Sequence, residues 1–227
     1  MMIQDARTTK KLAKDTFEAW AETYDHSLLN YFLFRPSYYT FLEELAKWGA
    51  GRDGPFNILD IGCGTGTFPG MIALSNLDAR HIVGLDYAME MCQQAARKLQ
   101  RFDPDHLVSF VNGDSEHLPF PDAMFDIVTC ANSFHHYPHQ QVVVSEMRRL
   151  IRPGGRLMII DGFRDNAIGW VVFDVVIATI EKSVHHAPWT TMRSYFEQAG
   201  FSEIYHRKFN FLFPAFITVG SVPADDG

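Results

Sequence analysis

Three glycines and a more distant acid form the most informative pattern in the sequence. Gly62, Gly64 and Gly66 follow the apolar run 58–61, and Asp86 ends a second apolar run. Glycine lets the backbone approach a ligand closely because no Cβ stands in the way, and the helix expected after the turn offers free N–H groups. An acid at the end of the next strand can accept hydrogen bonds from ribose hydroxyls. Together these residues predict a site for an adenosine-containing ligand.

The spacing of the glycines distinguishes between kinds of nucleotide site. A dinucleotide fingerprint reads G-x-G-x-x-G, whereas these glycines read G-x-G-x-G. No Lys-Ser or Lys-Thr pair follows them, so the nucleoside-triphosphate loop is also absent. The segment 60–66 instead resembles the first motif of the class I S-adenosylmethionine (SAM) methyltransferases. With the segments described below, the resemblance extends over roughly residues 17–220.

Strand and helix patterns alternate along the chain after the Gly- and Pro-containing linker 51–55. Apolar runs predict strands at 57–61, 81–85, 107–111, 125–131 and 155–161, with a closing pair at 201–207 and 209–219. Helical patterns lie between them at 67–76, 88–101 and 139–150. The expected fold is α/β, a doubly wound and mostly parallel seven-stranded Rossmann-like sheet that binds its ligand at the carboxyl ends of the strands. The resemblance implies that the last strand runs antiparallel to the others.

Helical segments are expected to flank this sheet. We predict a helical N-terminal cap at residues 1–50, a SAM-binding domain at 51–227 and, within that domain, a helical insertion or lid at 163–199. The cap holds two predicted helices, at 10–24 and 36–48. The apolar part of the insertion, Ala167 to Ile180, is too short to span a bilayer, which takes about 20 residues. A buried or lid helix is therefore expected there.

The resemblance implies roles for the acids around the glycine loop. Asp86 matches the family's acid that binds both ribose hydroxyls of SAM. Asp60 matches an acid that holds the ligand's ammonium side or the loop itself, and a simple cap on the following turn is the alternative. The loop residues expected to cradle the methionine side of SAM are Gly62, Cys63, Gly64 and Gly66.

Residues after three of the strands are expected to complete the cofactor site. Tyr87 and Met89 take positions at which the family packs apolar groups near the adenine, although ordinary packing at the start of a helix would also explain them. Asp114 and Ser115 belong to a segment that resembles the family's G-D-A-x-x-L-P-F motif. Their carboxylate and backbone N–H would contact the adenine, and Ser115 departs from the usual Ala. Asn132, after the fourth strand, would contact the methionine portion.

Three residues are candidates for catalysis. His135 and His136 lie in a loop that the resemblance places near the reactive methyl group, and histidine can serve as a general base near neutral pH. Many members of the family carry a histidine there without such a role. Tyr24 belongs to the segment 16–25, which resembles the F-x-x-x-A-x-x-Y-D entry helix of small-molecule methyltransferases, including the quinone-biosynthesis C-methyltransferase branch. It could position the substrate or merely pack the helix.

The charge, histidines and cysteines of the chain limit which partners and which compartment are expected. A net charge of −7 argues against a nucleic-acid surface. Adjacent histidines rarely bind one ion together, and no Cys or acid is spaced to complete a tetrahedral site, so we expect no metal. The three cysteines cannot all pair, which favours a reduced, cytoplasmic compartment. The polar segment from Met1 to Lys14 has no apolar signal-peptide core.

The sequence thus predicts a SAM-dependent methyltransferase, a monomer or homodimer, that acts on a small molecule such as a phenol, a quinol, an amine or an activated carbon. Two alternatives remain open: a methyltransferase that acts on lipid at a membrane surface, and a non-catalytic SAM-binding regulatory or scaffold protein. Membrane contact is not indicated by more than a few basic residues near the N-terminus, such as Lys10 and Lys14. A nicotinamide oxidoreductase is disfavoured by the glycine spacing.

Overall fold

The computed structural model of the chain describes residues 28–50, 52–100, 102–103, 106–162, 187–209 and 214–224. The helix expected at 10–24, with Tyr24, lies outside the described residues. So does the segment 163–186 of the predicted insertion.

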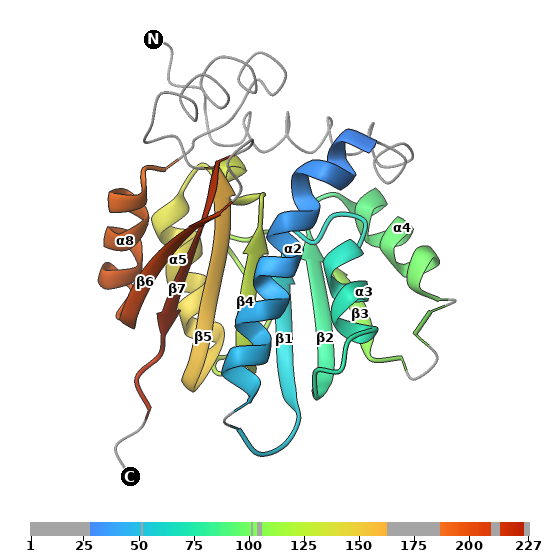
Figure 1. The fold of residues 1–227 in the computed structure, drawn as a ribbon, viewed down its shortest axis with the longest axis horizontal. Coiled ribbons are helices and arrows are strands. Elements are labelled where there is room, and N and C mark those ends of the chain that lie inside the picture. The colour runs from blue at the N-terminus through green and yellow to red at the C-terminus, as the bar shows by residue number, and fades with distance from the viewer. Residues whose placement is uncertain are drawn as a thin grey trace.

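The described strands form one seven-stranded sheet in the order β3-β2-β1-β4-β5-β7-β6 (Figure 1). Their bounds are Phe56–Ile61 (β1), Ala79–Asp86 (β2), Val108–Asn112 (β3), Phe125–Ala131 (β4), Ile151–Gly162 (β5), Ser202–Phe209 (β6) and Ala215–Ser221 (β7). Strands β1 to β5 pair in parallel, and β7 runs antiparallel to both of its neighbours. The predicted doubly wound, mostly parallel sheet is therefore confirmed.

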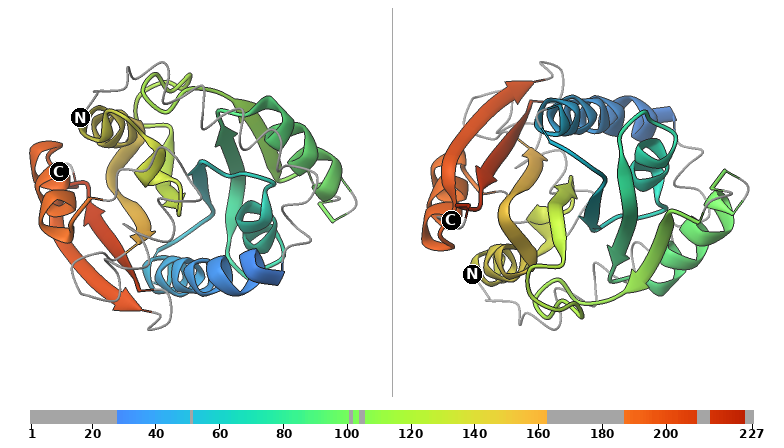
Figure 2. Two further views of the ribbon diagram at one scale, coloured as in Figure 1. Left: turned by 90° about the horizontal axis from the view of Figure 1, so that it is seen from above. Right: turned by 90° about the horizontal axis from the view of Figure 1, so that it is seen from below.

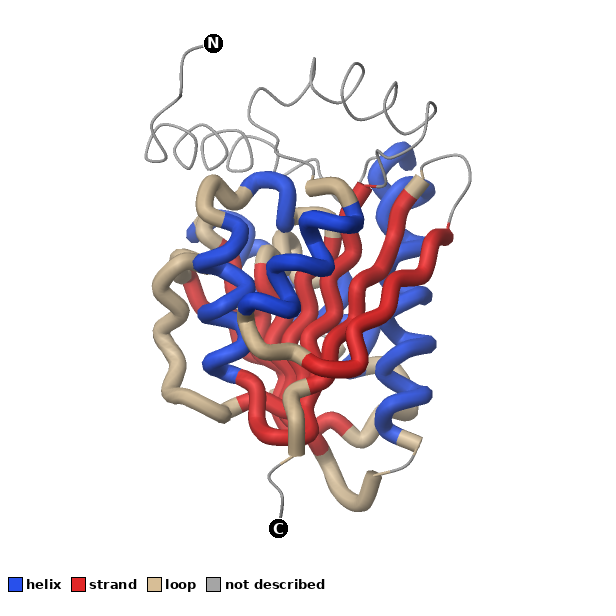
Figure 3. Tube along the Cα trace, turned by 90° about the vertical axis from the view of Figure 1, so that its left-hand side faces the viewer, coloured by secondary structure: helices blue, strands red, loops and turns tan. Residues whose placement is uncertain are grey.

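Helices cover both faces of this sheet (Figures 2 and 3). Their bounds are Leu28–Gly49 (α2), Thr67–Ala73 (α3), Met89–Leu99 (α4), Gln140–Leu150 (α5) and Trp189–Gln198 (α8), with a short 3-10 turn at Phe134–His136 (η2). Side chains of α2 and α3 pack together on one face, and side chains of α5 and α8 pack together on the other. None of the helices in the described part of the chain is long and apolar enough to cross a membrane.

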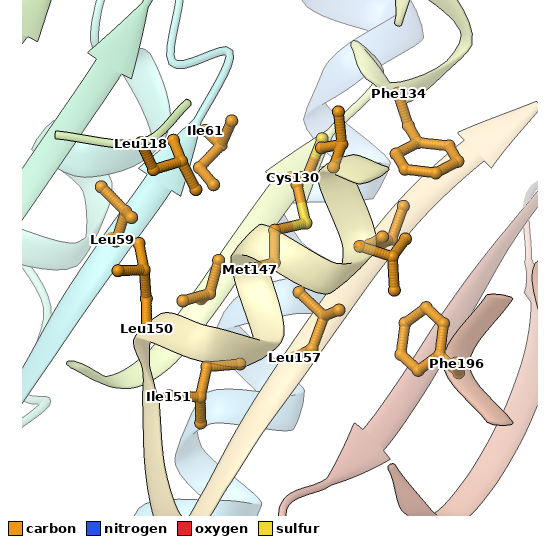
Figure 4. Close-up of a cluster of buried hydrophobic side chains, with 14 of the residues drawn as sticks. Leu59, Ile61, Leu118, Cys130, Phe134, Met147, Leu150, Ile151, Leu157 and Phe196 are labelled. Carbon is orange, nitrogen blue, oxygen red and sulfur yellow. The ribbon is translucent and has the colours of Figure 1, made fainter. Parts of the chain in front are cut away.

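The strand sequences explain this two-sided packing. Successive side chains of a strand point to opposite faces, and strands buried on both faces read as nearly continuous apolar runs. In β1, Ile58 packs with the α2 and α3 side chains, whereas Leu59 and Ile61 pack with Met147 and its neighbours in α5 (Figure 4). The central strands are thus enclosed, and only their carboxyl ends can form a site.

Several boundaries differ from the predicted ones. Helix α2 begins at Leu28 rather than at residue 36, so Pro36 lies inside it. A proline is typical of a helix start because it lacks an N–H, but α2 continues through Pro36, and its side chains after the proline, such as Phe41 and Leu45, pack against the sheet. Strand β5 begins at Ile151, directly after α5, rather than at residue 155. The β4–β5 register shifts before Arg156, and Gly154 in this stretch has a φ of 75°.

A buried acid attaches α2 to the far edge of the sheet. Glu44 is only 3% exposed and accepts hydrogen bonds from Tyr205 Oη at 2.7 Å and from Arg207 at 2.8 Å, both in β6. Burial alone would raise the pKa of Glu44, yet the hydrogen bonds from Tyr205 and Lys47 and the two nearby cations hold it below its ordinary value. The charged acid therefore joins two elements that are far apart in the chain.

Replacing Glu44 with alanine should destabilise the protein, because the polar groups of Tyr205 and Arg207 would lose their buried partner. We expect a loss of about 1–2 kcal/mol in the free energy of unfolding, measured by urea denaturation. Glu43→Ala is the matched control, since Glu43 contacts the same Lys47 and Arg207 from an exposed position. Equal effects of the two substitutions would contradict the assigned role of Glu44.

Candidate active site

A cavity opens at the carboxyl ends of β1, β2 and β4, next to α2. Its wall comes from five chain segments: residues 61–65, 85–88, 113–115, 131–133 and 136–138, with Thr67, Met91, Phe34 and Tyr38 from the helices. The parallel strands bring these segments to one edge of the sheet, which is the upper edge in Figure 1. Segments up to about a hundred residues apart in the chain therefore meet around one space, as the doubly wound topology requires.

The three glycines of the loop are needed for different reasons. A Cβ on Gly62 would lie 2.2 Å from Ser133 Oγ, and a Cβ on Gly66 would lie 2.7 Å from the Phe110 ring. Both glycines have a φ of 73°, in the left-handed region that disfavours a side chain. Gly64 also has a positive φ, of 52°, but no atom lies within 4 Å of its Cβ position. Gly62 and Gly66 thus allow close packing, whereas the space beside Gly64 is part of the cavity wall.

The carboxylate of Asp86 holds the loop in place from the end of β2. Its Oδ2 accepts from the backbone N–H of Gly64 at 2.8 Å, and its Oδ1 accepts from the N–H of Ala88 at 2.9 Å. Burial raises the pKa of Asp86, while these backbone hydrogen bonds act in the opposite direction. Each carboxylate oxygen has two lone pairs, so Asp86 can still accept hydrogen bonds from hydroxyl groups in the cavity that it lines.

Asp60 lies behind the loop and is not part of the cavity wall. It is 2% exposed, and its Oδ1 accepts from Thr129 Oγ1 at 2.7 Å, which joins β1 to β4. Burial raises the pKa of Asp60 to about 7; the Thr129 hydrogen bond opposes this shift and the charge of Asp86 adds to it. This position suits the support of the loop better than direct contact with a ligand.

The other residues expected at the cofactor site are divided between the cavity wall and its surroundings. The residues in the wall are Gly62, Cys63, Gly64, Asp86, Tyr87, Asp114, Ser115 and Asn132. Met89 is instead 43% exposed, and Met91, which the sequence did not single out, lies in the wall two residues further along α4. Gly66 lies beneath the loop, against Phe110.

The two expected catalytic histidines lie on the 3-10 turn η2, which is anchored by the fully buried Phe134 (Figure 4). His136 lines the cavity. His135 is buried beside it, with the two ring centroids 4.2 Å apart. Its Nδ1 lies 2.6 Å from Oδ1 of the buried Asp161, which also accepts from the N–H of Gly162 at 2.7 Å. The structure thus pairs a histidine with a carboxylate at the edge of the cavity.

Asp161 and the pair of Ser133 and Tyr137 are site residues that the sequence did not reveal. Asp161 is the last residue but one of β5, Asn132 follows β4, and these strands pair in parallel. An acid at the carboxyl end of a predicted strand is the sequence feature that could have indicated Asp161 as a site residue. Tyr137 Oη and Ser133 Oγ lie 3.1 Å apart directly over Gly62. Burial raises the pKa of Tyr137 well above its ordinary value, so the phenol stays protonated.

The described residues contain no group of three or more His, Cys, Asp or Glu side chains placed to hold a metal ion. Cys63, Cys92 and Cys130 are buried free thiols, and burial raises the pKa of all three. Since the thiolate is the reactive form, these cysteines are not nucleophiles.

Part of the chain is similar to known proteins. Residues 59–159 match the family model described as "Methyltransferase domain". A demethylmenaquinone methyltransferase from Listeria welshimeri is 36% identical over 114 residues, which is 50% of this chain and 48% of that protein. A 27-O-demethylrifamycin SV methyltransferase from Amycolatopsis mediterranei is 35% identical over 46% of this chain and 38% of its own length. The chain thus spans about half the length, or less, of these curated relatives.

Solved structures share the fold over a longer part of the chain. A SAM-dependent methyltransferase from Aquifex aeolicus aligns with a TM-score of 0.64 at 18% identity, over 96% of this chain and 98% of that one. A methyltransferase structure from Bacillus halodurans aligns with a TM-score of 0.65 at 21% identity, over 80% of this chain and 100% of that one. At such identities the likeness concerns the fold.

The raised pKa of Asp60 makes stability depend on pH. Between its unfolded value of 3.8 and its folded value of about 7, the folded protein keeps a proton that the unfolded chain releases. Its contribution to stability is therefore present at low pH and is lost as pH rises through this window. Asp60→Asn removes the titration, so from pH 5 to pH 8 this variant should gain roughly 2–3 kcal/mol relative to wild type.

Urea unfolding of both ligand-free proteins at the two pH values measures this difference. Asp78→Asn, at an exposed position before β2, is the control and should show no such trend. A stability difference between Asp60→Asn and wild type that does not change with pH would rule out a protonated Asp60.

Proposed function

We propose that the protein transfers the methyl group of SAM to a small molecule with a dissociable proton, such as a phenol or a quinol. The match of residues 59–159 to a methyltransferase domain model supports this proposal. The observation that carries this proposal is the pairing of His135 with Asp161 beside the cavity that Asp86 and Gly64 line. Because the chain spans only part of its relatives, its activity and substrate are inferences from its own residues.

The cavity wall suits the parts of SAM in a definite order. The free lone pairs of Asp86 can accept from the two ribose hydroxyls. Asp114 and Ser115 lie at the end of β3 next to it, where they can contact the adenine. The wall at Gly64 and the side chain of Asn132 then remain for the methionine portion. In this order the sulfonium would lie near the end of β4, on the side of His136.

The buried acids suit the charge of this donor. The charge of Asp86 lies close enough to Asp60 to raise its pKa. A sulfonium in the cavity would favour their ionised forms, because an opposite charge nearby lowers the pKa of a carboxyl group. The net charge of −7 also favours binding of a cationic donor.

The histidine–carboxylate pair supplies what the methyl acceptor needs. SAM carries an activated methyl group, so the protein has to align the acceptor and exclude water. A phenol or quinol must also lose a proton to become a good nucleophile. With Nδ1 of His135 donating to Asp161, Nε2 carries the ring's lone pair, and the nearby carboxylate favours the imidazolium that forms on proton transfer. We assign His135 as the general base and His136 to the wall that orients the acceptor.

The names of the relatives agree with an acceptor of this kind. One is named for a demethylmenaquinone and the other for position 27-O of a rifamycin. Both names describe organic small molecules, and neither describes a nucleic acid or a protein substrate.

Asp86→Ala should weaken binding of SAM and of S-adenosylhomocysteine about ten- to a hundredfold, since a hydrogen bond to a charged group contributes about 1.5–3 kcal/mol. Titration calorimetry on the wild type and the variant measures this effect. Asp86→Asn should lie between them because it keeps one acceptor oxygen, and Asp78→Ala serves as the surface control. Unchanged affinity in Asp86→Ala would remove this residue from the cofactor site.

His135→Asn and Asp161→Asn should lower kcat/KM towards a phenolic acceptor, by about 10²–10⁴-fold for the histidine. The loss should shrink along a series of increasingly acidic phenols, because these ionise without a base. His139→Asn is the matched control, since His139 also faces a carboxylate, Glu116 at 3.1 Å, but on the surface. Equal activity of His135→Asn and wild type at every phenol acidity would exclude the general base.

A further inference from the structure

Asn132 occupies an unusual backbone position at the edge of the cavity. It follows β4, lines the cavity and has a φ of 54°, in the left-handed region. Among residues with a side chain, asparagine tolerates this region best. Its own N–H donates to Ile160 O at 2.9 Å, which holds this backbone against β5. The side chain of Asn132 therefore projects from a fixed point.

The amide of Asn132 is bonded on one side only. Its Oδ1 accepts from Ser37 Oγ at 3.2 Å. Its Nδ2 is buried and has no hydrogen-bond partner among the residues that the structure describes. Buried N–H groups are nearly always satisfied in native proteins, so this orphaned donor on the cavity wall indicates an acceptor supplied by a ligand.

Ser37 reaches Asn132 from the cap helix. It is 2% exposed and lies in α2 between Phe34 and Tyr38, whose side chains also line the cavity. Seven residues later, on the same face of the helix, Glu44 is tied to β6 by Tyr205 and Arg207. The helix that carries Ser37 is thus held against the sheet independently of the cavity.

We propose that Ser37 is a positioning residue: it holds the Asn132 amide so that Nδ2 donates a hydrogen bond to an oxygen acceptor of the bound ligand. This inference rests on the proposed function, because the ligand is taken to be SAM or its methyl acceptor. The oxygen comes either from the carboxylate of the methionine portion or from the acceptor molecule. In both cases α2 helps to select the ligand through a residue 95 positions away in the chain.

An isosteric substitution tests which way the Asn132 amide donates. Asn132→Asp keeps the size of the side chain and an oxygen for Ser37 to donate to, but it replaces the donor Nδ2 with an acceptor. We expect ligand binding to fall about ten- to a hundredfold in Asn132→Asp, as for the loss of a buried hydrogen bond next to an acceptor. If Asn132 instead accepted from the ammonium group of SAM, this variant would bind as well as the wild type or better.

Ser37→Ala should have a smaller effect, about three- to tenfold, because the amide can then rotate. In the double variant Ser37→Ala/Asn132→Ala the effects should not add, since Ser37 acts through Asn132. Ser145→Ala, an exposed serine of α5 that bonds only to its own helix, is the matched control. Thermal unfolding of each variant separates a loss of folding from a loss of binding, and Asn132→Asp decides the question if Ser37→Ala does not fold.

Three ligands distinguish the source of the oxygen in titration calorimetry: SAM, S-adenosylhomocysteine and 5′-methylthioadenosine, which lacks the amino-acid part. If Asn132→Asp weakens binding of SAM and S-adenosylhomocysteine but not of 5′-methylthioadenosine, the oxygen belongs to the methionine carboxylate. Unchanged affinity for all three with a raised KM for the methyl acceptor identifies the acceptor oxygen. No change in any of these values for Asn132→Asp and Ser37→Ala overturns the proposal. Failure of the wild type itself to bind SAM overturns the proposed function, and this inference with it.

Discussion

The two hydrogen bonds that the Asp86 carboxylate accepts from the N–H groups of Gly64 and Ala88 are the interaction on which the site depends. They tie the end of β2 to the glycine loop that leaves β1. From the other side, Ser133 packs so closely on Gly62 that no side chain would fit there. The loop is thus held between the ends of β2 and β4, and Gly64 lines the cavity. A ligand that binds Asp86 meets a preformed surface, which lowers the entropic cost of binding.

This arrangement requires acids to lie where water is scarce. Burial raises the pKa of both Asp60 and Asp86, and the charge of Asp86 raises the pKa of Asp60 further. Such positions cost folding stability, and buried groups of this kind tend to occur at functional sites. A cationic methyl donor would offset part of that cost when it binds. The same reasoning applies at the end of β5, where the buried Asp161 pairs with His135. The parallel sheet explains why these acids gather, because the carboxyl ends of its strands share one edge.

Local patterns in the sequence were enough to predict the sheet, most of its strands and the glycine loop, because the apolar runs and the glycine spacing are properties of short segments. The contacts that complete the site join residues far apart in the chain. His135 meets Asp161 across 26 residues, and Asn132 meets Ser37 across 95. Periodicity carries no information on which side chains meet across elements. Pro36 was misread for a related reason, since α2 continues through the proline and packs its later side chains against the sheet.

A crystal structure of the chain with S-adenosylhomocysteine tests the central claim most directly, namely that the glycine loop is one side of a SAM site. We expect the ribose hydroxyls to lie within hydrogen-bond distance of Asp86 and the adenine to lie beside Asp114 and Ser115. The amino-acid end should lie over Gly64 and point towards Asn132. A ligand bound away from the loop, or a ribose that contacts no carboxylate, would contradict it.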